Sequence, residues 1–153
     1  MKRPLYEDRA RYDYWLRLIL FGIPLILLSI GIILIPEDPE GAIAMFSGSL
    51  FVIFLFYLVL PKKYQIFEDK LKIVLGWPLY VDISLTNISD SQITSGRKVF
   101  AYWGIRFATS TKSVVEIIRK RGLNIVISPS NGPLFVDRLN EACKQQQITE
   151  GKP

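Results

Sequence analysis

The side chains able to catalyse a reaction are few in this sequence. Histidine is absent, which excludes Ser-His-Asp triads and Cys-His pairs. Cys143 is the single cysteine, so the chain can form neither an internal disulfide nor a multi-cysteine metal site, and we expect a plain thiol on a helix. The carboxylates of Asp82, Asp90, Glu116 and Asp137 are scattered, and nothing in their spacing pairs them. The sequence therefore predicts no enzyme, no cofactor and no metal site.

The basic stretch "RKRG", Arg119 to Gly122, is the first candidate for a binding site. It can bind anionic lipid headgroups, or it can be an ordinary solvated hairpin turn, which Gly122 favours. The stretch "TSTK", Thr109 to Lys112, is too short for a phosphate-binding loop and lacks the glycine pattern of one. No nucleic-acid-binding motif is present, and a nearby membrane would itself explain the basic residues, so we expect no nucleic acid partner.

The aromatic stretch "FAYWGIRF" is the second candidate. Phe100, Tyr102 and Trp103 can enter a membrane interface or meet a partner. The alternative is core packing, with Gly104 forming a turn.

Two apolar runs must position these candidates relative to a membrane. They cover residues 15–35 and 42–60, interrupted only by Arg17 near the start of the first. About twenty residues in a helix cross about 30 Å, the thickness of the hydrocarbon layer. A cleaved signal peptide would have a shorter apolar core, without a second span so close behind it. We therefore expect two membrane spans.

Charge predicts how the spans are oriented. The connector "PEDPEG", residues 36–41, is short enough to force an antiparallel hairpin, and it carries three acidic and no basic side chains. Residues 1–17 carry five basic side chains, and Lys62 and Lys63 follow the second span. The positive-inside rule then predicts both termini in the cytoplasm. Aromatic side chains gather at the basic ends of the spans, as in an interfacial belt.

Small residues in the spans favour helix packing over transport. Gly31 lies at about the level of Gly48 in such a hairpin, and Ala44 and Gly48 form a small-xxx-small pair, so these three residues are the expected helix contact. Pro24 can kink the first helix. No charged residue lies deep within either span, as ion and proton pathways usually require.

The rest of the chain alternates like β-strands. Runs near residues 64–67, 71–75, 81–85 and 88–94, another from Ile105, and a hairpin of 113–119 with 123–128 predict about seven short antiparallel strands. Ser130 or Asn131 can cap a final helix, with Pro133 in its first turn and Phe135, Leu139 and Ala142 on one face. We expect a soluble domain over residues 62–147, a polar tail over 148–153, and residues 1–61 in the membrane part.

This order resembles small bacterial membrane proteins that carry a pleckstrin-homology-like domain after a transmembrane helical hairpin. The resemblance covers nearly the whole chain and lies in "YQIFEDKLKIVLGW", "YWGIRF" and "VVEIIRKRGLNIVISPSNGPLFVDRL". It implies a mainly-β, pleckstrin-homology-like fold and a membrane-tethered interaction module. Phosphoinositide-binding relatives place basic residues in the first hairpin turn. Here that turn is Glu68-Asp69-Lys70, so inositide recognition is not implied.

Counting the strands as an up-and-down meander predicts which rim of the domain faces the membrane. Strands that leave and return alternately put the turns at residues 68–70, 86–87 and 110–112 far from the bilayer. The rim expected to face the membrane or a partner consists of Lys62, Lys63, Trp77, Arg97, Lys98, Trp103, Arg119, Lys120 and Arg121.

We therefore expect a non-enzymatic interaction or scaffold module, integral to a bacterial-type plasma membrane. It would assemble or regulate a membrane protein or complex from the cytoplasmic face, with the lipid bilayer and a membrane protein as its partners. The alternative is a small transport or channel subunit that acts through the helical hairpin.

Overall fold

The computed structural model describes residues 3–94, 105–112 and 114–150. The chain forms two compact units. The helical unit is Tyr14–Val59, and the β unit combines Met1–Asp13 with Leu60–Pro153.

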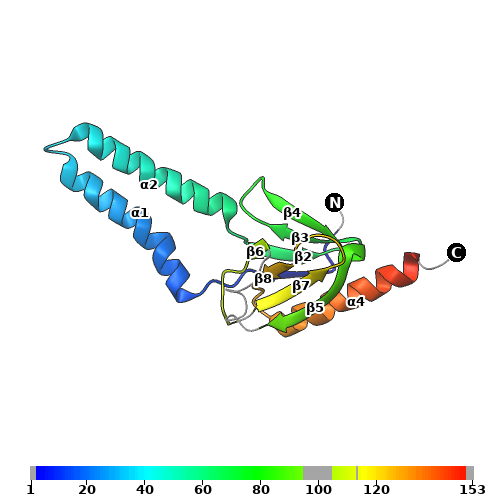
Figure 1. The fold of residues 1–153 in the computed structure, drawn as a ribbon. Coiled ribbons are helices and arrows are strands. Elements are labelled where there is room, and N and C mark those ends of the chain that lie inside the picture. Colours follow the sequence, from blue (N-terminus) through cyan, green and yellow to red (C-terminus); the bar gives the residue numbers. More distant parts are fainter. Residues whose placement is uncertain (1–2, 95–104, 113, 151–153) are drawn as a thin grey trace. The chain divides into compact units, whose positions relative to one another are not determined.

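The helical unit is an antiparallel hairpin of α1 (Tyr14–Leu34) and α2 (Pro39–Val59), drawn in blue and cyan in Figure 1. Both helices are long and apolar enough to cross a membrane. Most of their large apolar side chains are exposed. Exposed apolar side chains all around a long helix are typical of a membrane span rather than of a helix in a soluble core.

The two helices touch where small side chains let them approach. Gly31 faces the ring of Phe46, and a Cβ atom added to Gly31 would lie 2.7 Å from Cε1 of that ring. Ser49 is buried and its hydroxyl donates a hydrogen bond to the backbone oxygen of Pro24 at 3.1 Å. Ala42 is also buried on this face.

Two of the three small residues predicted at the helix contact lie elsewhere. Ala44 is exposed, and a Cβ atom added to Gly48 would have nothing within 4 Å. The reason is helical phase. Ala42 and Ser49 face α1, and at about 100° per residue Ala44 is turned about 200° from Ala42 and Gly48 about 100° from Ser49.

The β unit begins with a four-stranded antiparallel sheet in the order β1-β2-β3-β4. Its strands are β1 (Tyr6–Arg9), β2 (Lys63–Ile66), β3 (Lys70–Val74) and β4 (Tyr80–Ser84). In β1 and β2, Tyr6 pairs with Ile66 and Arg9 with Lys63. Strand β1 was not predicted, because its charged sequence was assigned with the spans. The β unit therefore contains residues on both sides of the helical hairpin, whereas the sequence predicted that the soluble domain starts at residue 62.

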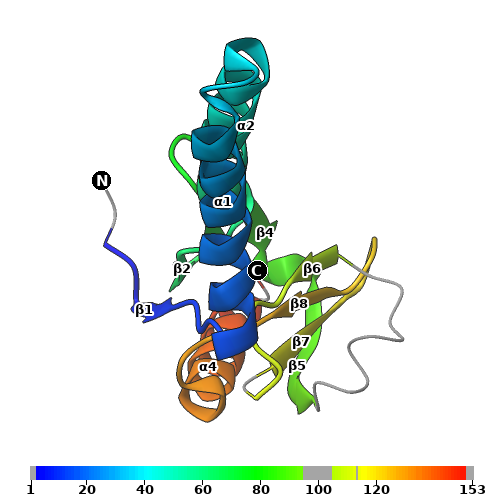
Figure 2. The ribbon, with the colours of Figure 1, turned by 90° about the vertical axis from the view of Figure 1, so that its left-hand side faces the viewer.

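A one-turn 3-10 helix, η1 (Leu85–Asn87), leads into a second four-stranded sheet in the order β5-β7-β8-β6 (Figure 2). Its strands are β5 (Ile88–Thr94), β6 (Ile105–Phe107), β7 (Val114–Arg119) and β8 (Ile125–Ile127). Strands β5 and β8 are antiparallel to β7, but β6 is parallel to β8. The described residues thus form eight strands, one pair of them parallel, where about seven antiparallel strands were predicted.

One apolar core joins the two sheets and the last helix. Alternate residues of β2 and β3 are fully buried, including Tyr64 and Ile73, while their neighbours face outward. The second sheet contributes Ile117 and Ile127 to the same cluster. This alternation is the period of two that the sequence predicted.

Helix α4 (Gly132–Glu150) covers this core and packs beside β5 (Figure 1). The side-chain oxygen of Asn131 accepts a hydrogen bond from the backbone N–H of Leu134 at 3.3 Å, as expected of a cap. Phe135, Leu139 and Ala142 are buried, as predicted. The helix runs to Glu150, so the predicted polar tail begins inside it.

Candidate functional site

The β unit has one end at which the chain passes to and from the helices. Asp13 precedes α1, and Leu60 follows α2. The Tyr12 hydroxyl donates to the backbone oxygen of Pro61 at 2.5 Å, which holds the two connections together. Burial raises the pKa of this tyrosine. We call this the attachment end.

A buried carboxylate, that of Asp13, lies at the attachment end. Asp13 is 8% exposed and accepts hydrogen bonds from the hydroxyls of Ser110 and Thr111 at 2.6 and 2.8 Å and from the N–H of Thr111 at 2.7 Å. The Asp13 N–H donates to the backbone oxygen of Thr109. These bonds fix residues 109–111 beside the last residue before α1, whereas the meander count predicted them at the opposite end.

The β3–β4 turn, residues 75–79, also lies at the attachment end. The N–H of Lys62 donates to the backbone oxygen of Val74 at 2.8 Å, and Val74 pairs with Tyr80 across the turn. Trp77 is 82% exposed, the highest value among the large apolar side chains described, and Leu79 and Tyr80 are exposed beside it. The ammonium of Lys72 lies 3.9 Å from the centre of the Tyr80 ring, a cation–π contact.

The opposite end, which we call the far end, carries the "RKRG" turn between β7 and β8. Gly122 has a φ of 92°, a backbone conformation that residues other than glycine rarely adopt. The Asn87 side chain accepts from the N–H of Arg121 at 3.0 Å and donates to its carbonyl at 3.1 Å. The N–H of Lys120 donates to the Asn87 carbonyl at 2.8 Å. Thr86, Asn87, Lys120 and Arg121 line an open depression of about 450 Å³.

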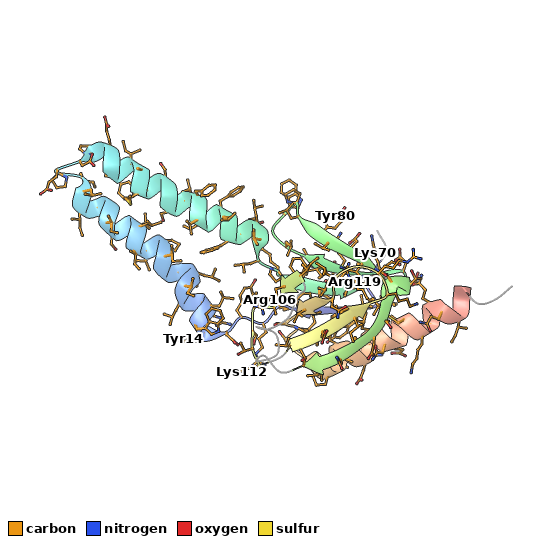
Figure 3. All side chains as sticks on the ribbon, in the orientation of Figure 1. Tyr14, Lys70, Tyr80, Arg106, Lys112 and Arg119 are labelled. Atoms are coloured by element: carbon orange, nitrogen blue, oxygen red, sulfur yellow. The ribbon has the colours of Figure 1, made fainter. Side chains whose placement is uncertain are left out.

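Figure 3 labels residues at both ends of the β unit. Arg119 and Lys70 lie toward the far end, and Lys112 lies toward the attachment end. The Arg119 guanidinium donates to the carbonyl of Leu123 and so stabilises its own turn. Lys70 pairs with Asp82 at 2.6 Å. The side chains of Lys120 and Arg121 are exposed at the far end.

Of the nine residues predicted to share one rim, the six that the structure describes divide between two ends. Lys62, Lys63 and Trp77 lie at the attachment end, with Lys63 paired to Glu7 at 3.1 Å. The basic turn of Arg119, Lys120 and Arg121 lies at the far end. The prediction that these groups share a rim was wrong because β6 runs parallel to β8, which reverses the ends after β5. Arg97, Lys98, Phe100, Tyr102 and Trp103 lie outside the described residues.

The acidic side chains hold the fold together. Asp13 is buried at the attachment end, and exposed Asp82 pairs with Lys70. Glu116 is buried in β7, where the amides of Gln92 and Asn124 donate to it at 3.4 and 3.1 Å. In the part of the chain that is described, no three His, Cys, Asp or Glu side chains gather in a way that could hold a metal ion.

The thiol of Cys143 lies half-buried on α4, 4.0 Å from the carbonyl of Leu85. Burial raises its pKa above the ordinary range, and the charge of Lys120 acts weakly in the opposite direction. A raised pKa leaves less reactive thiolate at neutral pH.

Sequence reasoning missed the Asp13 cluster and strand β1. The sequence signal for Asp13 was weak: one carboxylate directly before an apolar span. Its partners lie almost a hundred positions away, so spacing alone could not pair them.

Comparisons of this chain with protein-family models, with curated proteins and with solved structures found no match.

Proposed function

We propose that this protein is a non-catalytic interaction module, anchored in a bacterial-type plasma membrane by α1 and α2. In this proposal it assembles or regulates a membrane protein or complex from the cytoplasmic face. One observation carries the proposal: the helical hairpin is inserted between β1 and β2, which pair with each other in a single sheet.

This insertion ties the β unit to the anchor at two points. If both helices span the bilayer, the pairing of Arg9 with Lys63 requires the chain to leave and re-enter the membrane on one side. The acidic connector, Glu37 to Glu40, and the basic residues before α1 then favour the cytoplasm for the β unit and for both termini. A domain held by two short connections stays at the membrane surface, where its partners are membrane proteins.

A pleckstrin-homology-like fold of the β unit is part of the proposal. Two four-stranded sheets around one core, followed by a C-terminal helix, support it.

The far end is the surface we assign to the partner. Lys120 and Arg121 are exposed beside an open depression, and their backbones are fixed by Asn87. A turn with a fixed backbone and exposed cations is a suitable binding surface for an acidic patch on another protein, because charge complementarity guides and orients association.

The test is affinity purification of the full chain in mild detergent, with a photo-crosslinker placed at Thr86. A Lys120→Glu/Arg121→Glu variant is compared with Lys62→Glu/Lys112→Glu, which makes the same change in charge at the attachment end. We expect a single membrane protein to crosslink to the wild type and to the second variant, and the crosslink to be lost in the first. Equal crosslinking in both variants would contradict the far-end surface.

Ion or solute flux through liposomes that contain only this protein would contradict the interaction module itself. Such flux would support the alternative of a transport or channel subunit, in which the helical hairpin carries out the transport.

A further inference from the structure

The β3–β4 turn is an exposed apolar tip on the β unit. Trp77 is 82% exposed, Tyr80 55% and Leu79 44%, and these three residues are close neighbours in the chain. Scattered single exposed apolar residues are ordinary, but a contiguous group marks an interaction site. The exposed apolar tip is therefore a candidate binding surface.

The chain itself limits how far this tip can lie from the membrane anchor. Leu60 follows α2, and Lys62, two residues later, is hydrogen-bonded to Val74. Trp77 is three residues beyond Val74. At about 3.3–3.6 Å per residue, the chain covers at most about 7 Å from Leu60 to Lys62 and at most about 11 Å from Val74 to Trp77. The headgroup layer extends about 5–8 Å beyond the hydrocarbon on each side, so the tip is within reach of it.

The chemistry of the tip suits that layer. Tryptophan and tyrosine are enriched at the membrane–water interface, where one part of the ring is in an apolar and the other in a polar medium. The ammonium of Lys72 is held over the Tyr80 ring, and Lys112 is exposed at the same end. Of the nearby acids, Glu7 is paired with Lys63, and Asp13 is buried. Asp82, opposite Lys72 in the sheet, is paired with Lys70. The attachment end thus offers apolar rings and lysines to an anionic surface.

We infer that the β3–β4 turn inserts Trp77 and Leu79 into the headgroup layer of the bilayer that holds α1 and α2. Lys72 contacts anionic lipid, and the contact adds a third point that fixes the orientation of the β unit. This inference rests on the membrane anchoring proposed above. It names lipid as the occupant of the tip, and leaves the far end to the protein partner.

The experiment uses the full chain in nanodiscs that contain phosphatidylglycerol. Trp15→Phe and Trp103→Phe leave Trp77 as the single tryptophan fluorophore. A matched chain adds Trp77→Phe and Arg121→Trp, which moves the fluorophore to the far end. We expect lipids brominated near the headgroup to quench Trp77 far more than the tryptophan at position 121, and aqueous acrylamide to do the reverse. Equal quenching at the two positions would overturn the inference and leave the tip for a protein partner.

A third chain separates failure of this inference from failure of the anchoring. It keeps only Trp15, at the start of α1, through Trp77→Phe and Trp103→Phe. Quenching of Trp15 by brominated lipid without quenching of Trp77 overturns the tip contact and leaves the anchor standing. Absence of quenching at Trp15 overturns both.

A nitroxide provides the same comparison without changing Trp15 or Trp103. It is attached at Trp77→Cys or at Arg121→Cys in a Cys143→Ser chain. Lipid-borne relaxation agents should act more strongly on the first position, and equal effects would again count against the tip contact.

Discussion

Gly31 is the position where one methyl group should most disturb the helical hairpin. An added Cβ atom would lie 2.7, 3.0 and 3.2 Å from three atoms of the Phe46 ring. Carbon atoms attract best at about 3.5–4.0 Å, so the ring or the helix must move. Overpacking of this kind costs about 1–3 kcal/mol.

Gly48 provides the matched control on the partner helix. A Cβ atom there would meet nothing within 4 Å, so the substitution adds no clash. Replacing glycine by alanine within a helix removes backbone freedom from the unfolded chain and is worth up to about 1 kcal/mol. We therefore expect Gly31→Ala to destabilise the hairpin and Gly48→Ala to leave it unchanged or slightly more stable.

Hairpin opening can be measured by Förster transfer in mixed micelles. Dyes are placed on Leu18→Cys and Leu55→Cys, two exposed positions, in a Cys143→Ser chain, and sodium dodecyl sulfate is added until transfer is lost. Gly31→Ala should lower the midpoint relative to Gly48→Ala. Equal midpoints would refute the close approach at Gly31.

A double-mutant cycle tests the assigned cause. Phe46→Ala removes the ring that the methyl group added at position 31 would strike. If that ring causes the cost, Gly31→Ala should destabilise the Phe46→Ala chain less than the wild type, with a coupling of about 0.5–3 kcal/mol between the two sites. Independent effects would mean that the cost of Gly31→Ala arises elsewhere.

Three further predictions concern the β unit. Asp13→Asn should cost about 1.5–3 kcal/mol of stability, because hydrogen bonds to a buried charge are lost; thermal unfolding in detergent should show this, and exposed Asp137→Asn should not. Phe135→Ala should cost about 3–5 kcal/mol in the same assay, since the ring packs edge-on against two tyrosines, and a small effect would place the ring outside the core. The thiol of Cys143 should react with iodoacetamide more slowly at pH 8 than a thiol introduced by Gln147→Cys, because burial raises the pKa of Cys143. The difference in rate should shrink as pH rises, and equal rates at pH 8 would contradict the burial.

The elements that the sequence predicted well depend on local pattern. The alternation through Tyr64–Ile66 and Leu71–Ile73 has the period of a strand with one buried face, and both strands are observed. Helix α4 was predicted from a cap and three apolar residues on one face. In each case the residues that determine the element lie within it or next to it.

Strand β1 could not be predicted in this way. Its sequence, Tyr-Glu-Asp-Arg, has only four residues and three of them are charged. It is a strand because its backbone pairs with β2, more than fifty residues later, after the whole helical hairpin. Glu7 illustrates this, since its carboxylate receives bonds from Gln65 and Lys63 and its pKa is lowered by them. Pairing across such a separation leaves no local period in the sequence.

The direction of β6 had the largest effect on the candidate site. An antiparallel meander reverses at every turn, and one parallel pair inverts each end that follows. That inversion brings Ser110 to Asp13 and takes Arg121 to Asn87. The turn between β7 and β8 was predicted from its local sequence, but which turns share an end depends on pairing between strands distant in sequence.

The separation of the two ends bears on what the basic far end is for. Strand β5 runs from the far end, where Ile88 pairs with Arg119, to the attachment end, where Thr94 pairs with Val114. Its six residue steps of about 3.3 Å span about 20 Å. The field of an anionic leaflet decays within a Debye length of about 8–10 Å at physiological salt. If the β3–β4 turn touches the headgroups, the field of that leaflet is therefore largely screened at Arg121, and the exposed cations there remain available to a different anionic partner, such as the proposed acidic protein surface.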